Sequence, residues 1–198
     1  LKVIAERIHL LTETLRAGLQ KLGYTVENKC SFDTLKVVTS KHQEILAAAE
    51  ALQINLRNYQ NEISNEQAIG VSFDETCDIE TLEKVLIAFN FGKMLNFAVT
   101  DLVAKSCIPS SLQRQTPYLT HPVFNLHHSE HELTRYIHTL QNRDLTLTHS
   151  MIPLGSCTMK LNATTELVPV SWPSVSQLHP FAPDNQTQGM MEMIRSLE

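Results

Sequence analysis

Apolar residues recur every three to four positions in three segments of the first half of the chain, and this spacing predicts three amphipathic helices. The first covers residues 1–22 and ends at Gly23, a residue type that commonly follows a helix. The second follows Ser40, which forms a capping-box pattern with Gln43. The third follows Asp78, whose carboxylate can cap a helix N-terminus. The core-facing positions of these helices are Ile4, Ile8, Leu11, Leu15, Leu22, Ile45, Leu46, Ala49, Leu52, Ile79, Leu82, Val85, Leu86 and Phe89.

Short segments between the predicted helices have the pattern of β-strands. Residues 34–39 form an apolar, β-branched run, residues 54–57 alternate apolar and polar, and residues 69–73 alternate again. The polar stretch 61–65 is a predicted turn between the last two strands. The element order is therefore α-β-α-β-β-α. We expect an α/β (α+β) fold, in which a small three-stranded sheet has helices packed on one face.

The pattern becomes irregular after residue 92. Residues 93–108 predict at most a weak helix, and residues 109–128 contain three prolines and predict a connector. Ser129 and Glu132 form a second capping box, followed by a helix with its apolar positions at Leu133, Tyr136, Ile137 and Leu140. Residues 145–183 contain five of the eight prolines and only two charged residues. We therefore expect an extended ribbon there that other protein covers.

Composition indicates a globular protein of the size of one core with an appendage. The chain has 198 residues, is 42% hydrophobic and carries a net charge of −5, so it offers no basic surface for nucleic acid or for an acidic membrane. No apolar run approaches the ~18 residues that a membrane-spanning helix needs. The four cysteines are widely spaced and contain no CxxC motif, which argues against a zinc ribbon and a disulfide scaffold and fits a reducing compartment.

The two ends of the chain lie within periodic segments. The sequence begins at Leu1 inside a helical pattern, and it stops at Glu198 inside another apolar-periodic segment. Neither end has a helix cap or a targeting peptide. We therefore expect this chain to be an excised piece of a longer polypeptide.

Lys160 is the first candidate for chemistry, because it is the only cation in the charge-poor segment. A covered ammonium needs an anionic partner, which could be Glu166, a phosphate or a substrate carboxylate. By residue type it could also be a Schiff-base lysine. The alternative is a lysine whose apolar stem is covered and whose amine reaches solvent.

A turn of small residues, Gly155–Thr158, precedes this lysine. Its backbone N–H groups and hydroxyls suit a phosphate or a carboxylate. The alternative is an ordinary turn in which Cys157 packs as a small hydrophobic residue. His149 and His179 flank the segment, and each is either functional or satisfied by backbone groups.

Histidines are concentrated in one region, with six of the nine between residues 121 and 149. His127 and His131 are four residues apart, a spacing that could hold a metal if both lay on one helix. Ser129 is the expected N-cap, so His127 precedes the helix and this geometry fails. The same holds for His128 with His131. We therefore expect no metal site.

The segment Met151–Asn162 (Met-Ile-Pro-Leu-Gly-Ser-Cys-Thr-Met-Lys-Leu-Asn) resembles a signature of the glycine cleavage system P-protein, a pyridoxal-phosphate (PLP) decarboxylase. The resemblance continues through His149–Ser150, Glu166–Pro169 and Leu178–Phe181. A match over more than thirty consecutive residues is far more specific than a short motif. Weaker resemblances are found in Arg7–His9, Leu19–Gly23, Phe32–Leu35, Ile54–Arg57 and Leu119–Asn125.

The resemblance implies a place for this chain within that family. Its members are similar to two fold-type-I PLP subunits fused in tandem, of which only the second carries the cofactor. On this mapping, residues 1–108 are the small C-terminal domain of the first, cofactor-free half. Residues 109–185 form a helix and an extended bridge between the halves, and residues 186–198 begin the PLP-carrying half.

The activity implied by the resemblance is glycine decarboxylation, with PLP stabilising the carbanion left by loss of CO₂. The aminomethyl group then passes to the lipoyl arm of the carrier H-protein. The cofactor lysine of the family lies in an Asn-Leu-His-Lys segment that this chain does not contain. Lys160 is therefore expected to line the pocket, and the isolated chain should neither hold PLP nor catalyse a reaction. The pocket-lining candidates are Ser156, Cys157, Thr158, Lys160, Asn162, His149 and His179.

The resemblance also implies the second half of the same polypeptide as a partner and a homodimeric parent. The expected location is the cytoplasm in a bacterium or the mitochondrial matrix in a eukaryote. A competing hypothesis is a ligand-sensing or dimerisation module with no part in catalysis, which the order α-β-α-β-β-α also suits. A free-standing module would have no use for the long ribbon of residues 145–183. A different fold-type-I PLP enzyme is the third hypothesis, which the signature at 151–162 disfavours.

Overall fold

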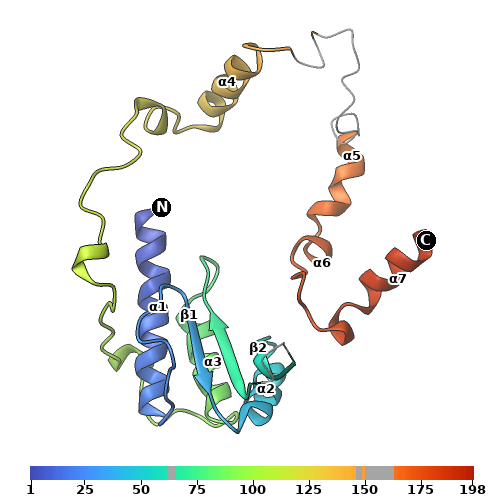
Figure 1. Ribbon diagram of the computed structural model, residues 1–198. Coiled ribbons are helices and arrows are strands. Elements are labelled where there is room, and N and C mark those ends of the chain that lie inside the picture. The colour runs from blue at the N-terminus through green and yellow to red at the C-terminus, as the bar shows by residue number, and fades with distance from the viewer. Residues whose placement is uncertain (62–65, 146–148, 150–162) are drawn as a thin grey trace. The chain divides into compact units, whose positions relative to one another are not determined.

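The computed structural model describes residues 1–61, 66–145, 149 and 163–198. The chain divides into two compact units, Leu1–Arg114 and Gln115–Glu198, and each is described by itself. Figure 1 shows that the strands all belong to the first unit. None of the helices in the described part of the chain is long and apolar enough to cross a membrane.

Three α-helices of the first unit match the three predicted from apolar spacing. They are α1 (Lys2–Lys21), α2 (His42–Ala51) and α3 (Ile79–Phe89). Gly23 follows α1 with φ +87°, a conformation that glycine adopts without strain. Asp78 caps α3 as predicted, because its carboxylate accepts the backbone N–H of Thr81. The predicted cap of α2 by Ser40 is wrong, since Lys41 occupies the N-cap position and no side chain caps this helix.

The sheet of the first unit contains β1 (Thr34–Val38), β2 (Arg57–Asn58) and β3 (Ala68–Ser72). Both neighbours pair antiparallel with the central β3, in the order β1-β3-β2. The predicted order α-β-α-β-β-α is confirmed. The strand predicted at residues 54–57 is much shorter than expected. The N–H of Ile54 bonds to the carbonyl of Ala49 at the end of α2 instead of joining the sheet.

The core of the first unit lies between the sheet and its helices. Register pairs Leu35 with Val71 and Val37 with Ile69 on β1 and β3, and all four side chains are buried. Alternate residues of a strand face the same side, so these two pairs present one apolar surface to the helices. The helical and connecting residues in the same buried cluster are Leu11, Leu15, Leu19, Ile45, Phe73, Leu82, Val85, Leu86, Phe89 and Val99.

The weak helix predicted at residues 93–108 is reduced to one short 3₁₀ turn, η2 (Val99–Asp101). The chain leaves α3 through Phe91 and Gly92, both with positive φ, and this reverses its direction. Leu95, Phe97 and Leu102 then pack singly against the core. Separate anchor points of this kind hold an irregular segment in place without a regular helix.

A disulfide between Cys30 and Cys107 joins the start of this unit to its end. The cysteine spacing argues only against a disulfide scaffold, and it does not predict this single bond. The two Cα atoms lie 5.3 Å apart although 77 positions separate them in the sequence. Sequence spacing gives no signal for a pairing of this length, because tertiary folding brings the two segments together. Cys77 is the free cysteine of the described residues.

The second unit is built from short helical segments. The longest are α4 (Glu130–Gln141) and α7 (Gln188–Leu197), and α4 begins with the predicted capping box of Ser129 and Glu132. The remaining α-helices are α5 (Thr164–Leu167) and α6 (Pro173–Ser176). Short 3₁₀ turns occur at Ser110–Leu112 in the first unit and at Pro122–Phe124, Val168–Ser171 and Asp184–Gln186 in the second.

The prediction of an extended ribbon fails for its described part, residues 163–183. Successive helical turns replace it, and Pro169 and Pro173 each lie in the first turn of one of them. Proline fits this position because a first-turn N–H has no partner within the helix. These two prolines therefore mark the starts of short helical turns in a segment for which we expected an extended ribbon.

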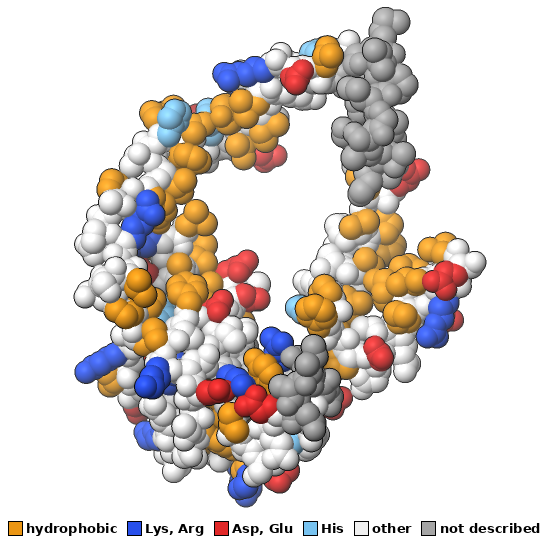
Figure 2. Space-filling model, viewed as in Figure 1, with side chains coloured by type: hydrophobic (Ala, Val, Ile, Leu, Met, Phe, Trp, Pro, Cys, Tyr) orange, Lys and Arg blue, Asp and Glu red, His pale blue; other side chains and the backbone are white. Residues whose placement is uncertain are grey.

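No residue described between Gln115 and Glu198 is buried. Figure 2 shows hydrophobic side chains at the surface of this unit. On α4, the exposed fractions are 47% for Leu133 and 54% for Ile137. The described residues therefore leave these apolar positions about half exposed.

Candidate functional site

Five of the predicted pocket-lining residues lie outside the described residues: Ser156, Cys157, Thr158, Lys160 and Asn162. Their role stays a prediction. Glu166, considered as a partner of Lys160, accepts the backbone N–H of Ala163 through Oε2 at 3.1 Å. This bond fixes the first turn of α5.

The two flanking histidines are described, and both are exposed. The Nδ1 atom of His179 accepts the backbone N–H of Phe181 at 3.0 Å, and the two rings lie 5.7 Å apart. His179 is thus satisfied by a backbone group, as one of the two interpretations had it. His149 lies in a turn. Their pocket-lining role remains a prediction.

The histidines before α4 have partners of their own. The His127 ring stacks on Tyr136 with centroids 4.2 Å apart. Nε2 of His128 donates to the carbonyl of Asn125 at 2.7 Å. Ser129 caps α4, as the argument against a metal at these histidines required.

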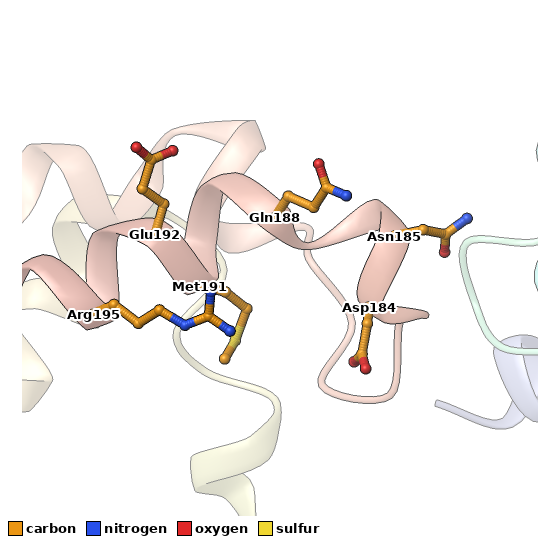
Figure 3. A pocket seen from close by; sticks show the side chains of 6 residues that line it. All are labelled: Asp184, Asn185, Gln188, Met191, Glu192 and Arg195. Atoms are coloured by element: carbon orange, nitrogen blue, oxygen red, sulfur yellow. The ribbon is translucent and has the colours of Figure 1, made fainter.

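A cavity of about 680 Å³ lies along α7 and the turn before it. Figure 3 shows that its side chains point in different directions, with Glu192 and Asp184 on opposite sides of the segment. Binding sites usually place a few polar groups so that they converge on a ligand. This surface hollow lacks that convergence, so it is not a candidate for cofactor binding.

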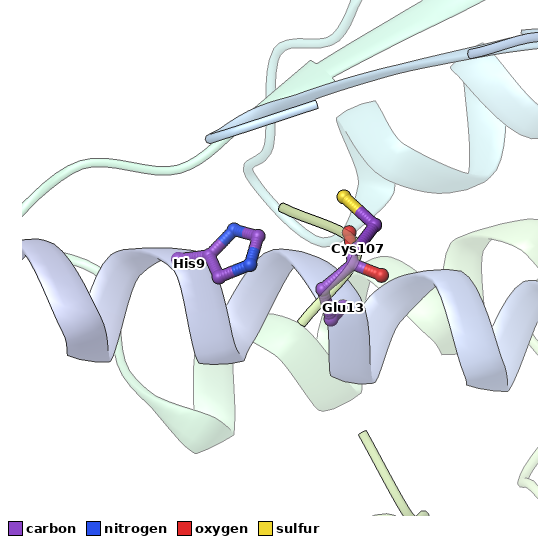
Figure 4. Close-up of side chains that lie close together, drawn as sticks. All are labelled: His9, Glu13 and Cys107. Carbon is purple, nitrogen blue, oxygen red and sulfur yellow. The ribbon is translucent and has the colours of Figure 1, made fainter. Parts of the chain in front are cut away.

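The first unit contains a buried cluster of polar side chains that the sequence analysis missed. His9 and Glu13 lie one turn apart on α1 and are 8% and 5% exposed. One ligand-type atom from each of His9, Glu13 and Cys107 lies within 4.8 Å of the others. Figure 4 shows His9 and Glu13 on α1 with Cys107 beside the Glu13 carboxylate. The only signal in the sequence was two polar residues, four apart, beside the apolar stripe of a helix.

Arg16 neutralises the buried carboxylate of this cluster. Its Nε lies 3.2 and 3.1 Å from the two carboxylate oxygens of Glu13. The rest of the guanidinium donates to the carbonyl of Asn28 and, at 2.9 Å, to the hydroxyl of Ser31. A buried charge is costly unless it is paired and hydrogen-bonded, and both conditions are met here.

The imidazole of His9 is held through both ring nitrogens. Nδ1 lies 3.0 Å from the carbonyl oxygen of Phe32, and this oxygen can only accept. Nδ1 therefore donates. Nε2 lies 2.8 Å from the Ser106 hydroxyl, and in the neutral form of this imidazole it accepts from that hydroxyl. The Phe32 ring stacks nearly parallel on the imidazole.

Lys36 and Lys84 do not fit the requirements of a PLP-carrying lysine, whose amine must lose its proton to react with a carbonyl. Lys36 contacts Glu27 at 2.8 Å and Glu66 at 2.6 Å, and hydrogen bonds to these two carboxylates raise the pKa of the lysine. A hydrogen bond to the carboxylate of Glu80 likewise raises the pKa of Lys84. Both lysines are held in the charged form, so neither is suited to bond to PLP.

Comparison with known proteins gives a consistent result. The family model described as "Glycine cleavage system P-protein" matches residues 1–89. A glycine dehydrogenase (decarboxylating) of Bdellovibrio bacteriovorus is 55% identical over 201 residues, a match covering all of this chain and 20% of that protein. The mitochondrial glycine dehydrogenase (decarboxylating) of Pisum sativum is 50% identical and 18% covered. An Arabidopsis thaliana protein, also mitochondrial, is 50% identical and 19% covered. The chain spans about a fifth of the length of these relatives.

Proposed function

We propose that the chain belongs to the glycine cleavage system P-protein family and is a structural and pocket-forming part of a PLP-dependent glycine decarboxylase. The observation that carries this proposal is the extent of the similarity. At 55% identity it runs through the whole chain, so it includes the second unit as well as the first.

The proposed role of the first unit is structural. Its buried cluster of sheet and helix residues gives it a stable core of its own. We assign residues 1–108 to the small domain of a half that carries no cofactor. Residues 109–185 would bridge to the PLP-carrying half, which residues 186–198 would begin. When bound there, PLP supplies the electron sink for loss of CO₂ from glycine.

The proposed role of residues 145–183 is to line the path to the active site. The exposed apolar side chains of its described part support this assignment, since they need cover from another part of the protein. A wall with few charges excludes water, which would protect a carbanion from early protonation. Lys160 would supply one positive charge for a substrate carboxylate, a phosphate or an incoming lipoyl thiolate. Ser156 and Thr158 would add hydroxyl groups.

The proposed partner is the lipoyl-carrying H-protein, which would accept the aminomethyl group, and the complete enzyme would be a homodimer. Named relatives include mitochondrial proteins and one from a bacterium, so either compartment suits the family.

A chimaera tests this function directly. The corresponding fifth of the Bdellovibrio bacteriovorus relative is replaced by this chain, and glycine decarboxylation is measured with H-protein. We expect a folded chimaera that retains PLP and turns over glycine. A chimaera that folds, holds PLP and is inactive would contradict the proposal and favour the ligand-sensing or dimerisation module.

Lys160→Met within the chimaera tests the pocket assignment. Loss of a charge-assisted contact should cost about 2–4 kcal/mol of transition-state stabilisation, which lowers the rate roughly thirty-fold to several hundred-fold. Lys93→Met is the matched control, because Lys93 is an exposed lysine of the first unit. PLP content and thermal melting are compared first. Near-native turnover in a well-folded Lys160→Met chimaera would remove Lys160 from the active site.

A further inference from the structure

We propose that His9, Glu13, Cys107 and Cys30 form a zinc-type metal site in the reduced protein, which the Cys30–Cys107 disulfide closes on oxidation. This site is separate from the residues proposed to take part in glycine decarboxylation. It lies wholly within the first unit, and its four ligands come from α1 and from two segments that the disulfide brings against each other.

The histidine is already arranged as a metal ligand. Its Nδ1–H donates to the carbonyl of Phe32, which fixes the tautomer and the ring orientation. Metal-bound histidines almost always make such an outer hydrogen bond with the nitrogen that does not bind the metal. The other nitrogen, Nε2, lies 2.8 Å from the Ser106 hydroxyl, whose oxygen also accepts the backbone N–H of Ile108. A metal bound at Nε2 would take the place of this hydroxyl.

The Glu13 carboxylate is also held in a fixed orientation, by Arg16. Arg16 contacts both oxygens of Glu13 and is itself held by Asn28 and Ser31. Two thiolates and one carboxylate around a divalent ion leave a net charge of −1 on the site. The guanidinium of Arg16 would balance that charge. It pairs with Glu13 in the disulfide-bonded structure and would neutralise the whole metal complex in the reduced protein.

The dimensions suit a tetrahedral ion after a small adjustment. Zinc bonds of about 2.0–2.3 Å place neighbouring tetrahedral ligand atoms about 3.3–3.8 Å apart. The ligand atoms of His9, Glu13 and Cys107 already lie within 4.8 Å of one another. Side-chain movements of about 1 Å close that gap for these three ligands. The fourth, the Sγ of Cys30, is bonded to the Sγ of Cys107 and must turn toward the ion once the disulfide is broken. Thiolate and imidazole ligands favour zinc over magnesium or calcium, which prefer oxygen.

Opening the site is a two-electron reduction by a cellular dithiol. The dithiol gives two electrons and two protons to the S–S bond of Cys30 and Cys107, so that bond breaks, two thiols form, and the dithiol leaves as its own disulfide. The divalent ion then displaces the two thiol protons into solvent as the thiolates bind it. Disulfide and metal exclude each other because both use the same sulfur atoms.

Cobalt(II) is the probe for this site, because a cobalt–thiolate centre absorbs visible light and shows a sulfur-to-metal charge-transfer band. The full 198-residue chain is prepared oxidised and, separately, reduced and freed of reductant and metal without oxygen. We expect stoichiometric binding with both spectral features in the reduced chain, and neither feature in the oxidised chain. Zinc should then displace cobalt and raise the melting temperature of the reduced chain, as a ligand of the folded state does.

Variants assign the ligands. His9→Gln and Cys107→Ser should each weaken binding beyond the roughly ten- to hundred-fold that loss of an outer partner causes. Cys77→Ser and His127→Gln are controls, because neither residue is in the cluster, and both should bind as the unaltered chain does. Circular dichroism checks that the unaltered reduced chain keeps its fold. The comparison of cobalt binding between its oxidised and reduced forms then stands even if one variant fails to fold.

Three outcomes would overturn the proposal. The first is a reduced, folded chain without a cobalt–thiolate band. The second is a band that persists in Cys107→Ser and disappears in Cys77→Ser. The third is equal binding by the oxidised and reduced chains, which would place the metal elsewhere.

Discussion

Helices α3 and α4 have nearly the same length and the same kind of N-terminal cap, yet only α3 belongs to a core. Asp78 caps α3, and Ser129 caps α4 with a complete capping box. Five residues of α3 are buried, whereas α4 has none. The comparison distinguishes what starts a helix from what buries it. Caps and apolar periodicity are enough to start and orient a helix, but burial requires a second element to pack against.

The same difference extends to the two units. The first has a sheet whose buried face needs cover, and α1 and α3 supply it. The described helices of the second unit have apolar faces but no sheet and no buried residue. An isolated helix of fewer than about 12–15 residues is marginal in water. The second unit therefore depends for its stability on protein surfaces that the first unit does not need.

Separating the units should produce the largest effect. We expect residues 1–114 alone to unfold cooperatively, with the melting temperature of the whole chain, because the buried cluster lies entirely within them. Residues 115–198 alone should lose helix gradually on heating, without a cooperative transition. Circular dichroism and calorimetry measure both. A sharp transition in a monomeric 115–198 piece would break the comparison.

Single truncations test the same difference at the level of one side chain. Phe89 is 1% exposed, and its removal in Phe89→Ala should lower the free energy of unfolding by about 3–5 kcal/mol through lost burial and a cavity. Ile137 on α4 is 54% exposed, and Ile137→Ala should change it by less than about 0.5 kcal/mol. Urea unfolding of both variants gives the values. Equal losses would mean that α4 is packed as tightly as α3.

Local signals in the sequence predicted the first unit well. The apolar stripes predict all three long helices, an apolar, β-branched run predicts β1, and alternation predicts β3. The caps at Asp78 and Ser129 were also read correctly, because each depends on residues within three positions. The prediction of an extended ribbon was wrong because it depended on composition and not on a local pattern of this kind. Proline is compatible with the first turn of a helix, and single-residue composition does not reveal whether a turn begins there.

The buried polar cluster could not be predicted, because its members meet only in the folded protein. Cys30 and Cys107 are 77 positions apart, and Ser106 is 97 positions from His9. No local pattern encodes contacts of that separation. The family signature at 151–162 had the opposite character: it indicated function strongly through sequence, while its residues lie outside the described structure.

The disulfide gives the next prediction, because it stabilises only the unit that has a core. Reduction of Cys30–Cys107 in the presence of a metal chelator should lower the free energy of unfolding by roughly 2–4 kcal/mol, since a closed loop of this length restricts the unfolded chain. Cys77→Ser should have almost no effect, because Cys77 is not in the disulfide. Equilibrium unfolding with and without reductant measures the difference. An unchanged midpoint on reduction would show that the disulfide does not constrain this unit.

Acid titration of the two caps gives the smallest and most selective effect. Hydrogen bonds from the backbone N–H and the hydroxyl of Thr81 lower the pKa of Asp78. Hydrogen bonds from Ser129 and from the N–H of His128 lower the pKa of Glu132. A carboxylate whose pKa is lowered by folding stabilises the folded state fully above its unfolded pKa, about 3.9 for Asp and 4.3 for Glu. That stabilisation is lost as the pH falls through the lower, folded value.

The outcome should differ between the two units even though both shifts have the same sign. Loss of the Asp78 charge should lower the melting temperature of the whole first unit, because α3 is part of its core. Asp78→Asn keeps a cap that does not titrate, so the melting temperature of this variant should fall less than that of the unaltered chain between pH 5 and about pH 3.

Loss of the Glu132 charge should reduce only the helicity of α4. Glu132→Gln should remove that pH-dependent change in helicity without changing the melting temperature. Asp74, whose pKa is also lowered by Thr76, titrates in the same window, so each variant is compared with the unaltered chain at every pH. A shift in the cooperative transition of the first unit caused by Glu132→Gln would show that α4 is coupled to that core, and the contrast between the two helices would then fail.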